Sequence, residues 1–249
     1  MRSMTKEELA KYIDHTLLAP QTGIREIVLL CQEARRYGFA SVCVNPVYVS
    51  AAANELEGSG VKVCTVVGFP LGATTTKDKV NESINAIENG AEEIDMVINI
   101  GAAKDGRFTE VETDILDVVT ACKEAGKKIG KNIIVKTILE TCLLDDNAIV
   151  NACLCAKKAG ADFVKTSTGF ANPKGIDGMP LPNGASESHV KLMRKTVGND
   201  MGVKASGGIR SARTLITMLE AGANRIGTSS GAKIIENWDE TKQVHLPTL

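Results

Sequence analysis

The chain has 249 residues, of which 43% are hydrophobic and 24% charged, and 29 Lys and Arg against 30 Asp and Glu give a formal net charge of −1. This balance argues against a nucleic-acid partner or an anionic membrane surface, and no apolar run approaches the roughly 18 residues of a membrane span. The first residues carry no apolar stretch of the kind found in signal peptides, so we expect a cytoplasmic protein with no membrane partner.

Short apolar runs recur along the chain, and most follow a glycine that ends a helical pattern. Glycine suits the position after a helix because it adopts the left-handed conformation without a Cβ penalty. Runs that are apolar on both faces suit buried parallel strands. We predict strands at residues 12–16, 39–44, 61–67, 94–98, 133–138, 163–166, 203–205 and 225–227.

Amphipathic helices are predicted between these strands. Apolar residues follow the i, i+3, i+4, i+7 spacing within residues 24–34, 111–122, 149–156 and 215–219. Thr5 and Glu8 form a capping-box pattern for a short N-terminal helix, and Ser211 is placed to cap a later helix. Eight strand–helix units in about 250 residues fit a closed (β/α)8 TIM barrel of the α/β class better than an open sheet. No shift in composition marks a boundary, so we expect residues 1–249 to form a single domain.

One connection, Phe170–Ala185, is unusually long and rich in proline and glycine. It follows a predicted strand, at the end of the barrel where active sites lie. The sequence leaves two interpretations open for it, a lid over the site and a simple surface insertion.

Lysine is rarely buried, yet Lys136, Lys165 and Lys204 lie at the same point of three successive strand patterns. A single lysine of this kind commonly points outward past the helices. Three in register indicate side chains inside the barrel, where crowded and partly desolvated ammonium groups would have lowered pKa values. Lys165, on the middle strand, should lose its proton most readily. It is the predicted nucleophile for a carbonyl carbon, giving a Schiff base.

Asp95 lies within the apolar run of residues 93–98, where a carboxylate is costly without cationic partners. The lysines are candidate partners, which would place Asp95 where it can transfer protons. The alternative is an aspartate at a strand end that caps a loop.

Two turns rich in small residues follow the last two predicted strands, at residues 205–208 and 227–231. In barrels, backbone N–H groups after the seventh and eighth strands commonly hold a phosphate. We therefore predict a phosphate site here. The chain lacks the Gly-x-x-x-x-Gly-Lys-Ser/Thr pattern, so no P-loop nucleotide site is implied.

Seven cysteines lie mostly inside apolar periodic segments, which favours buried reduced thiols over a disulfide framework. The chain has no Cys-x-x-Cys motif, and His15, His189 and His245 stand far apart. A zinc site would therefore need ligands gathered from distant positions. We expect neither a metal ion nor another cofactor.

Five segments together resemble the motifs of the deoxyribose-phosphate aldolase family: DHTLL at residues 14–18, VGFPLG at 67–72, EIDMV at 93–97, VKTSTGF at 164–170 and VKASGGIR at 203–210. They occur in the family's order, from about residue 14 to residue 230. The family consists of class I aldolases on a TIM barrel. The resemblance implies reversible cleavage of 2-deoxy-D-ribose 5-phosphate to acetaldehyde and D-glyceraldehyde 3-phosphate, without a metal, in deoxyribonucleoside breakdown.

The resemblance also assigns roles to residues of this sequence. It implies that Lys165 is the Schiff-base lysine and that Asp95 and Lys204 donate and accept protons. Three positions match supporting residues of the pocket, namely Asp14, Thr16 and Lys136. Five match phosphate-binding turns, namely Gly169, Gly207, Gly208, Ser229 and Ser230.

Two other functions stay open on the sequence alone. One is another Schiff-base aldolase or lyase that acts on a phosphorylated keto-acid or ketose. The other is a catalytically silent protein that binds a sugar phosphate in the same cavity. In each case the partner is a small phosphorylated molecule, and both a homodimer and a tetramer remain open.

Overall fold

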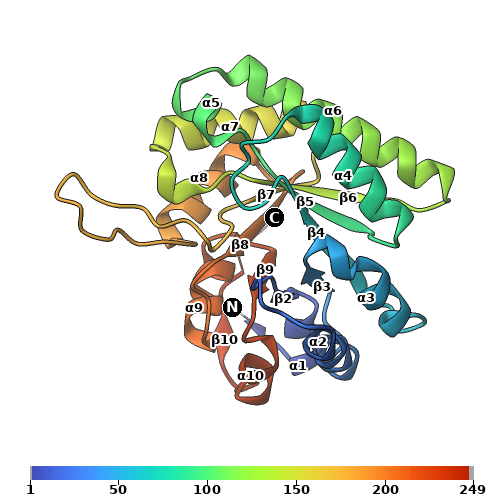
Figure 1. Ribbon diagram of the computed structural model, residues 1–249. Helices are drawn as coiled ribbons and strands as arrows, with labels where there is room; N and C mark the ends of the chain where they lie inside the picture. The colour runs from blue at the N-terminus through green and yellow to red at the C-terminus, as the bar shows by residue number, and fades with distance from the viewer. Residues whose placement is uncertain (1, 247–249) are drawn as a thin grey trace.

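The computed structural model describes residues 2–246, and eight parallel strands in it close into a barrel (Figure 1). The strands follow one another in chain order, and the last pairs with the first. Their bounds are β2 Ile13–Leu17, β3 Ser41–Val44, β4 Lys62–Val67, β5 Glu93–Val97, β6 Ile134–Ile138, β7 Phe163–Lys165, β8 Gly202–Ser206 and β9 Arg225–Thr228. The predicted (β/α)8 barrel is confirmed, and no strand end differs from its predicted position by more than two residues.

Helices surround the barrel (Figure 1). They are α1 Lys6–Ala10, α2 Ile24–Tyr37, α3 Val49–Leu56, α4 Thr76–Glu88, α5 Ile100–Lys104, α6 Phe108–Lys128, α7 Asp146–Lys158, α8 Glu187–Val197, α9 Ala212–Glu220 and α10 Gly231–Glu236, with 3-10 helices η1 Pro46–Tyr48 and η2 Thr141–Leu143. Thr75, Asp145, Ser186 and Ser211 each accept the backbone N–H three residues later. Each cap satisfies a donor that has no partner within its helix, and the predicted cap at Ser211 is confirmed.

The two ends of the described chain pack together. β1, Arg2–Ser3, pairs antiparallel with β10, Gln243–Val244, and Trp238 Nε1 donates to the carbonyl of Met4 at 2.8 Å. The predicted capping box of Thr5 and Glu8 is present at the start of α1. Within residues 2–246, no helix combines the length and apolar character needed to cross a membrane.

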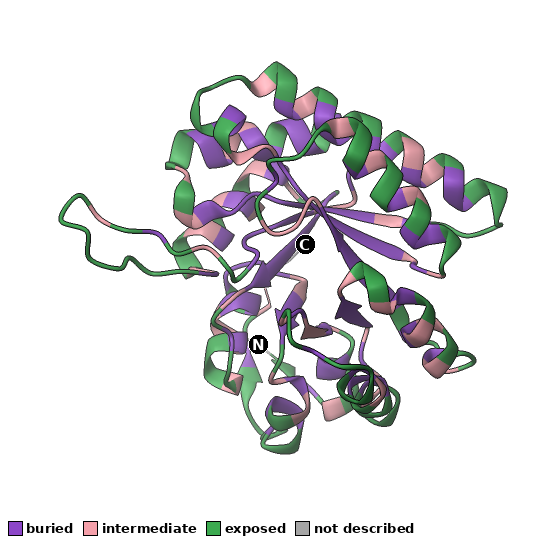
Figure 2. Ribbon diagram, viewed as in Figure 1, coloured by how far each residue is buried: buried purple, intermediate pink, exposed green. Residues whose placement is uncertain are grey.

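The two faces of the barrel strands carry different kinds of side chain, apolar toward the helices and charged toward the barrel interior. Val42, Ile94 and Val164 belong to one large apolar cluster that includes the inner faces of the helices. Neighbouring residues on a strand point to opposite faces, so Asp95 and its counterparts on the other strands point into the barrel. Figure 2 shows the barrel strands buried along most of their length, with half-buried or exposed residues at some strand ends. Charged side chains therefore fill much of the barrel interior, and the candidate site is built there.

The connection between β7 and α8 extends away from the barrel as a long arm, which we define as residues 171–184 (Figure 1). Its two sides meet at an antiparallel bridge between Lys174 and Pro180. Ile176, Met179 and Leu181 are largely exposed along it. The expected long loop is thus present, with the form of a surface insertion.

Candidate active site

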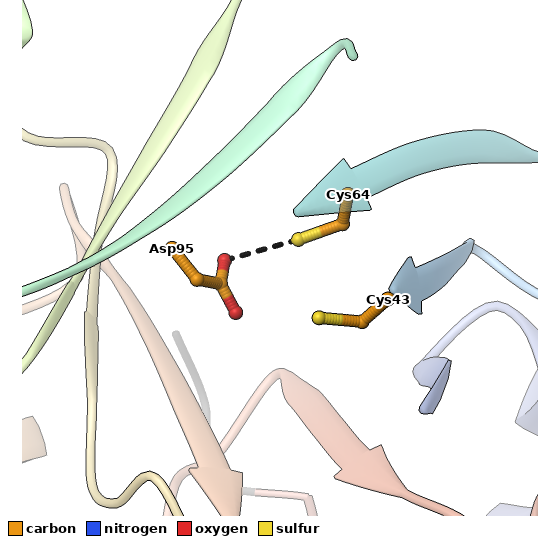
Figure 3. A group of neighbouring side chains, drawn as sticks. All are labelled: Cys43, Cys64 and Asp95. Carbon is orange, nitrogen blue, oxygen red and sulfur yellow. Dashed lines mark hydrogen bonds between the residues drawn. The ribbon is translucent and has the colours of Figure 1, made fainter. Parts of the chain in front are cut away.

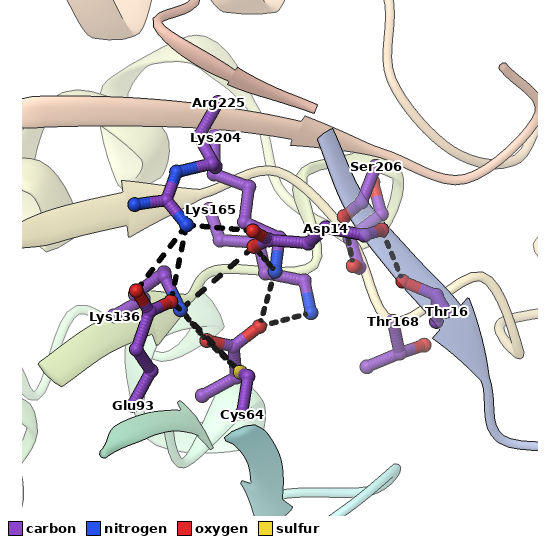
Figure 4. Close-up of polar contacts among 12 residues, drawn as sticks. Asp14, Thr16, Cys64, Glu93, Lys136, Lys165, Thr168, Lys204, Ser206 and Arg225 are labelled. Atoms are coloured by element: carbon purple, nitrogen blue, oxygen red, sulfur yellow. Dashed lines mark hydrogen bonds and ion pairs between the residues drawn. The ribbon is translucent and has the colours of Figure 1, made fainter. Parts of the chain in front are cut away.

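The three predicted lysines point into the barrel from the adjacent strands β6, β7 and β8 (Figure 4). Lys165 and Lys204 are Cα partners, whereas Lys136 pairs with Phe163, two residues before Lys165. Lys136 and Lys204 have no exposed surface, and Lys165 is 3% exposed. The predicted gathering of lysines inside the barrel is confirmed, with a stagger that the strand patterns did not indicate.

The three lysines meet at Asp95 on β5. Its Oδ1 accepts a hydrogen bond from Lys136 Nζ at 2.8 Å, and its Oδ2 accepts from Lys165 Nζ and Lys204 Nζ, both at 2.7 Å. Burial by itself would raise the pKa of Asp95, but the charges of the three lysines outweigh burial and hold this pKa well below its ordinary value. Asp95 is therefore a buried carboxylate among the lysines, not a loop cap, and one of its oxygens links Lys165 to Lys204.

Asp95 belongs to a closed ring of charges of alternating sign, and Figure 4 labels the other members of the ring. In order, its members are Asp95, Lys136, Glu93, Arg225, Asp14 and Lys204, with successive N–O distances of 2.8, 2.5, 3.2, 2.6, 2.5 and 2.7 Å. We call these six residues the charge ring. Its three cations and three carboxylates cancel, which avoids the cost of an unpaired charge in a buried region.

The carboxylates of the charge ring raise the pKa values of its two lysines, where the sequence predicted lower values. Burial lowers the pKa of Lys204, but Asp14 and Asp95 outweigh it and raise this pKa above its ordinary value. The pKa of Lys136 is likewise raised, against burial, by Asp95 and Glu93. The prediction of lowered pKa values was wrong for these two lysines, because it considered one carboxylate where the barrel interior holds three.

Lys165 lies outside the charge ring. Within the described residues, Asp95 is the one carboxylate that pairs with its ammonium group. Lys165 ends β7 and lines a pocket of about 320 Å³, whereas the described lining includes neither Lys136 nor Lys204. A ligand in this pocket would therefore meet Lys165.

The predicted supporting residues are divided between the pocket wall, which includes Thr16, and the charge ring, which includes Asp14 and Lys136. Thr16 lines the pocket, and its Oγ1 donates to the carbonyl oxygen of Asp14 at 2.8 Å. Burial raises the pKa of Asp14, but Lys204 and Arg225 outweigh it, so this pKa is lowered. Asp14 therefore stays charged, and its Oδ2 also lies 3.9 Å from Lys136 Nζ across the ring.

Small-residue turns form much of the pocket wall. Four residues of the predicted phosphate turns line it, namely Gly169, Gly207, Gly208 and Ser229. The three glycines have φ values of 86°, 87° and 77°, a region that residues with a side chain rarely adopt. Ser230 is absent from the described lining, and its N–H donates to Thr228 Oγ1 at 2.9 Å. The N–H of Ser230 is thus already engaged by Thr228, which itself lines the pocket.

Comparison with known proteins agrees with this geometry. Residues 8–237 match the DeoC/LacD family aldolase model, which covers most of the chain. The chain belongs to the DeoC/LacD aldolase family.

Relatives of this DeoC/LacD aldolase extend over nearly the whole chain. The deoxyribose-phosphate aldolase of Caldanaerobacter subterraneus is 53% identical over 94% of this chain and 97% of its own. That of Streptococcus pneumoniae is 56% identical over 92% and 96%. Among solved structures, the tetrameric deoxyribose phosphate aldolase from Aeropyrum pernix has a TM-score of 0.81 at 36% identity, covering 93% of this chain and 91% of that one.

Three charged residues of the aldolase site were not singled out from the sequence. Glu93 stands two residues before Asp95, and Arg225 opens β9, so strand alternation could have placed both inside the barrel. Arg210 follows the Gly207-Gly208 turn, lines the pocket and is exposed. The signal for Arg210 was its position directly after the predicted phosphate turn.

Two cysteines also reach the centre of the aldolase barrel (Figure 3). Ligand atoms of Cys43, Cys64 and Asp95 lie within 4.8 Å of one another, a spacing that a metal ion could bridge. The Cys64 thiol donates to Asp95 Oδ1 at 3.2 Å, and Lys136 Nζ lies 3.4 Å from the same sulfur. Because Asp95 already receives three ammonium groups, a metal cation would meet strong repulsion there. The grouping suits two thiols better than a metal.

Proposed function

We propose that this DeoC/LacD aldolase is a deoxyribose-phosphate aldolase. It cleaves 2-deoxy-D-ribose 5-phosphate reversibly to acetaldehyde and D-glyceraldehyde 3-phosphate through a Schiff base on Lys165, in deoxyribonucleoside breakdown. Relatives with more than half of their aligned residues identical carry this enzyme name. The observation that carries the residue assignment is the position of Lys165, outside the charge ring and at the pocket.

Charge balance distinguishes Lys165 from the two lysines of the charge ring. The six charges of the ring cancel, and among the described residues Lys165 pairs with Asp95 alone. An unpaired buried charge is costly. Proton loss from Lys136 or Lys204 is opposed by the two or more carboxylates that each contacts. Lys165 is therefore the lysine that supplies the nucleophile.

The reaction proceeds from attack of the Lys165 amine on C1 of the open-chain sugar. Loss of water gives a protonated Schiff base, which withdraws electrons from the neighbouring bond. Removal of the C3 hydroxyl proton breaks the C2–C3 bond and releases D-glyceraldehyde 3-phosphate. The remaining enamine is protonated at C2, and water then releases acetaldehyde and restores the amine.

Asp95 and Lys204 move the protons in these steps. Asp95 Oδ2 accepts hydrogen bonds from both Lys165 and Lys204, so a proton can pass between the two nitrogens through one oxygen. The raised pKa of Lys204 keeps it protonated as the donor. The lowered pKa of Asp95 keeps it ionised as the acceptor. Lys136 positions Asp95 and Asp14 positions Lys204 through their ion pairs. Thr16, at the pocket wall, donates a hydrogen bond to the backbone carbonyl of Asp14.

The phosphate of the substrate binds at the small-residue turns. Backbone N–H groups at Gly169, Gly207, Gly208 and Ser229 suit a phosphate because glycine lets the backbone approach it closely. Arg210 adds a positive charge at the same wall. Ser230, whose N–H is engaged by Thr228, contributes through its hydroxyl group.

Borohydride trapping tests the Schiff base directly. With acetaldehyde and borohydride, we expect mass spectrometry to find a reduced two-carbon adduct on Lys165, because an imine reduced in place cannot hydrolyse. Lys165→Met should lose the adduct and several orders of magnitude in turnover of 2-deoxy-D-ribose 5-phosphate. Lys191→Met is the matched control, since Lys191 is exposed and pairs with Glu187. A fully active Lys165→Met would contradict the assignment.

The same assay separates the two other functions. An aldolase for a different phosphorylated substrate would form the adduct on Lys165 without cleaving the deoxy sugar phosphate. A silent binding protein would bind the sugar phosphate with no turnover, and Lys165→Met would leave its affinity unchanged.

We also propose that residues 1–249 form one domain and that the chain assembles as a homodimer or homotetramer. Pairing of β9 with β2 supports one domain, because neither half of the chain can close the barrel alone. The tetrameric relative from Aeropyrum pernix supports assembly. Light scattering of the purified chain measures its molar mass in solution.

A further inference from the structure

Cys43 and Cys64 lie beside each other on the inner face of the barrel. They are Cα partners on the parallel strands β3 and β4, and their sulfur atoms lie within 4.8 Å of each other (Figure 3). Adjacent strands lie about 4.8 Å apart, and a disulfide accepts Cα separations of about 4.4–6.8 Å. The backbone therefore already stands at bridging distance, and the sulfurs have to close to about 2.05 Å.

The two thiols differ in their tendency to ionise. The neighbouring Cys64 thiol lowers the pKa of Cys43, and the positive charge of Lys204 helps. Burial raises the pKa of Cys64. Cys43 is therefore the thiol that supplies a thiolate, which is the reactive form, and Cys64 is the thiol that keeps its proton.

A small oxidant can approach the pair from the substrate pocket. Leu18 lines the pocket and packs in one small cluster with Cys43, Cys64 and Val66. Leu18 thus connects the pocket wall to the cluster that contains both sulfurs. Hydrogen peroxide is little larger than water, so movement of Leu18 would admit it.

We propose that Cys43 and Cys64 form a redox couple, which hydrogen peroxide closes to a disulfide and which thereby switches the aldolase site off. The Cys43 thiolate attacks one oxygen of peroxide, the O–O bond breaks, and hydroxide leaves, giving a sulfenic acid. The Cys64 sulfur then attacks the Cys43 sulfur and displaces the second hydroxide. The protons of the two thiols complete two water molecules, so two thiols are oxidised while one peroxide is reduced.

Closure of the disulfide removes contacts from the centre of the charge ring. In the reduced protein, Cys64 donates to Asp95 Oδ1 and accepts from Lys136 Nζ. The disulfide has no S–H to donate, and its sulfur moves toward Cys43. Asp95 then shifts relative to Lys165, and displacements of about 1 Å at a reacting group can cost roughly 100-fold in rate. Loss of activity rests on the proposed function, whereas formation of the disulfide does not.

The test exposes the reduced full-length protein to hydrogen peroxide and samples it over time. At each time we would alkylate the denatured chain, map linked peptides by mass spectrometry, and measure turnover of 2-deoxy-D-ribose 5-phosphate. We expect a peptide that links Cys43 to Cys64, two fewer alkylated thiols than the seven of the reduced chain, and at least about a tenfold loss of turnover. Dithiothreitol should restore both the thiols and the turnover.

Two variants sharpen the result, each compared with its own reduced form. Cys64→Ala removes one of the two sulfur atoms, so no disulfide can form between residues 43 and 64. Peroxide should then give no linked peptide and no loss of turnover that dithiothreitol reverses. Cys122→Ala, at a buried cysteine of α6, should respond as the natural chain does. A loss of turnover with all seven thiols intact, or oxidation of Cys43 alone without a link, would overturn the couple. A linked peptide in a protein that never turns over this substrate would instead overturn the proposed function and leave the disulfide standing.

Discussion

Arg225 connects two of the three carboxylates in the charge ring. Its guanidinium contacts Asp14 Oδ1 at 2.6 Å and Glu93 Oε2 at 3.2 Å, and it lies over the ring of Phe163 at 5.5 Å. Nη1 makes both of these carboxylate contacts, so one nitrogen of Arg225 joins Asp14 to Glu93. Arg225 therefore acts through Asp14 and Glu93 as a positioning residue for the lysines.

Replacement of Arg225 by methionine should destabilise the fold most near neutral pH, where Asp14 is ionised, and less in acid, where Asp14 becomes protonated. It leaves Asp14 and Glu93 short of a cation, and breaking a buried ion network costs about 3–5 kcal/mol. The lowered pKa of Asp14 stabilises the fold above the unfolded pKa, and this contribution is lost as the pH falls through the folded pKa. Without Arg225 the folded pKa of Asp14 rises, so acid unfolding should begin at a higher pH.

Thermal melts from about pH 3 to pH 7 measure this effect. Lys158→Met is the control, because Lys158 forms an ion pair with Glu112 but its own side chain is 74% exposed. Its melting temperature should stay close to that of the natural chain throughout. Equal acid sensitivity of the Arg225→Met and natural proteins would rule out a role for Arg225 in holding Asp14 charged.

At the residue scale, the sequence identified site residues where a charged side chain interrupts an otherwise apolar strand. Lys136, Lys165 and Lys204 stand out because lysine is foreign to an apolar strand. Glu93 and Arg225 lie at strand starts, where charged residues are common, so only strand alternation could have indicated that they point into the barrel. Their effect on the lysine pKa values depends on which side chains contact each other across the barrel. These contacts are known only once the barrel is closed.

At the element scale, the base of the arm supports the glycine turn of the pocket. The N–H of Ala185 donates to the carbonyl of Gly207 at 3.1 Å. Gly184 has a φ of 92°, and a Cβ on it would lie 2.4 Å from the oxygen of Gly207. Backbone therefore packs directly on backbone at this point, and the position of Gly207 depends on glycine at residue 184.

Gly184→Ala should weaken binding of the phosphorylated substrate. The added methyl group has to push the Gly207 turn away, which disturbs phosphate contacts more than it disturbs Lys165. We expect KM to rise about tenfold or more, equivalent to about 1.4 kcal/mol, with a smaller change in kcat. Gly178→Ala is the matched control, because Gly178 has a similar φ of 77° but nothing within 4 Å of its added Cβ. Similar KM values in the two variants would show that backbone strain, not contact with Gly207, governs the effect.

Elements were predicted well where apolar periodicity is strong. The eight strands are short and apolar on both faces, so their positions were found within two residues. The helices α4 and α8 were not singled out. In α4 the polar residues Lys79 and Ser83 occupy buried positions. In α8 the helical spacing of Val190, Met193 and Val197 was present but did not enter the prediction. The contact between Gly184 and Gly207 joins segments that are distant along the chain, and no local pattern indicates it.

At the scale of the whole molecule, the closed barrel makes the charge ring possible. Its members come from five strands, β2, β5, β6, β8 and β9, which meet only when the barrel closes. The apolar cluster between strands and helices supplies the burial that stabilises such a closed sheet. The interior positions can therefore carry charged residues that serve the reaction, because the apolar packing of the fold lies between the strands and the helices.

The arm lies outside this closed unit, and its removal should leave the aldolase intact. Replacing residues 174–181 with two glycines deletes mainly exposed side chains while keeping the base at Gly184. Substitutions at exposed positions usually change the free energy of unfolding by about 0.5 kcal/mol or less. Shortening the loop changes this free energy little, because the entropy of loop closure depends only weakly on loop length. Melting temperature and kcat should therefore stay close to those of the natural chain. A folded variant that loses kcat more than about tenfold would instead favour the lid, because closure of a lid excludes water from the reaction.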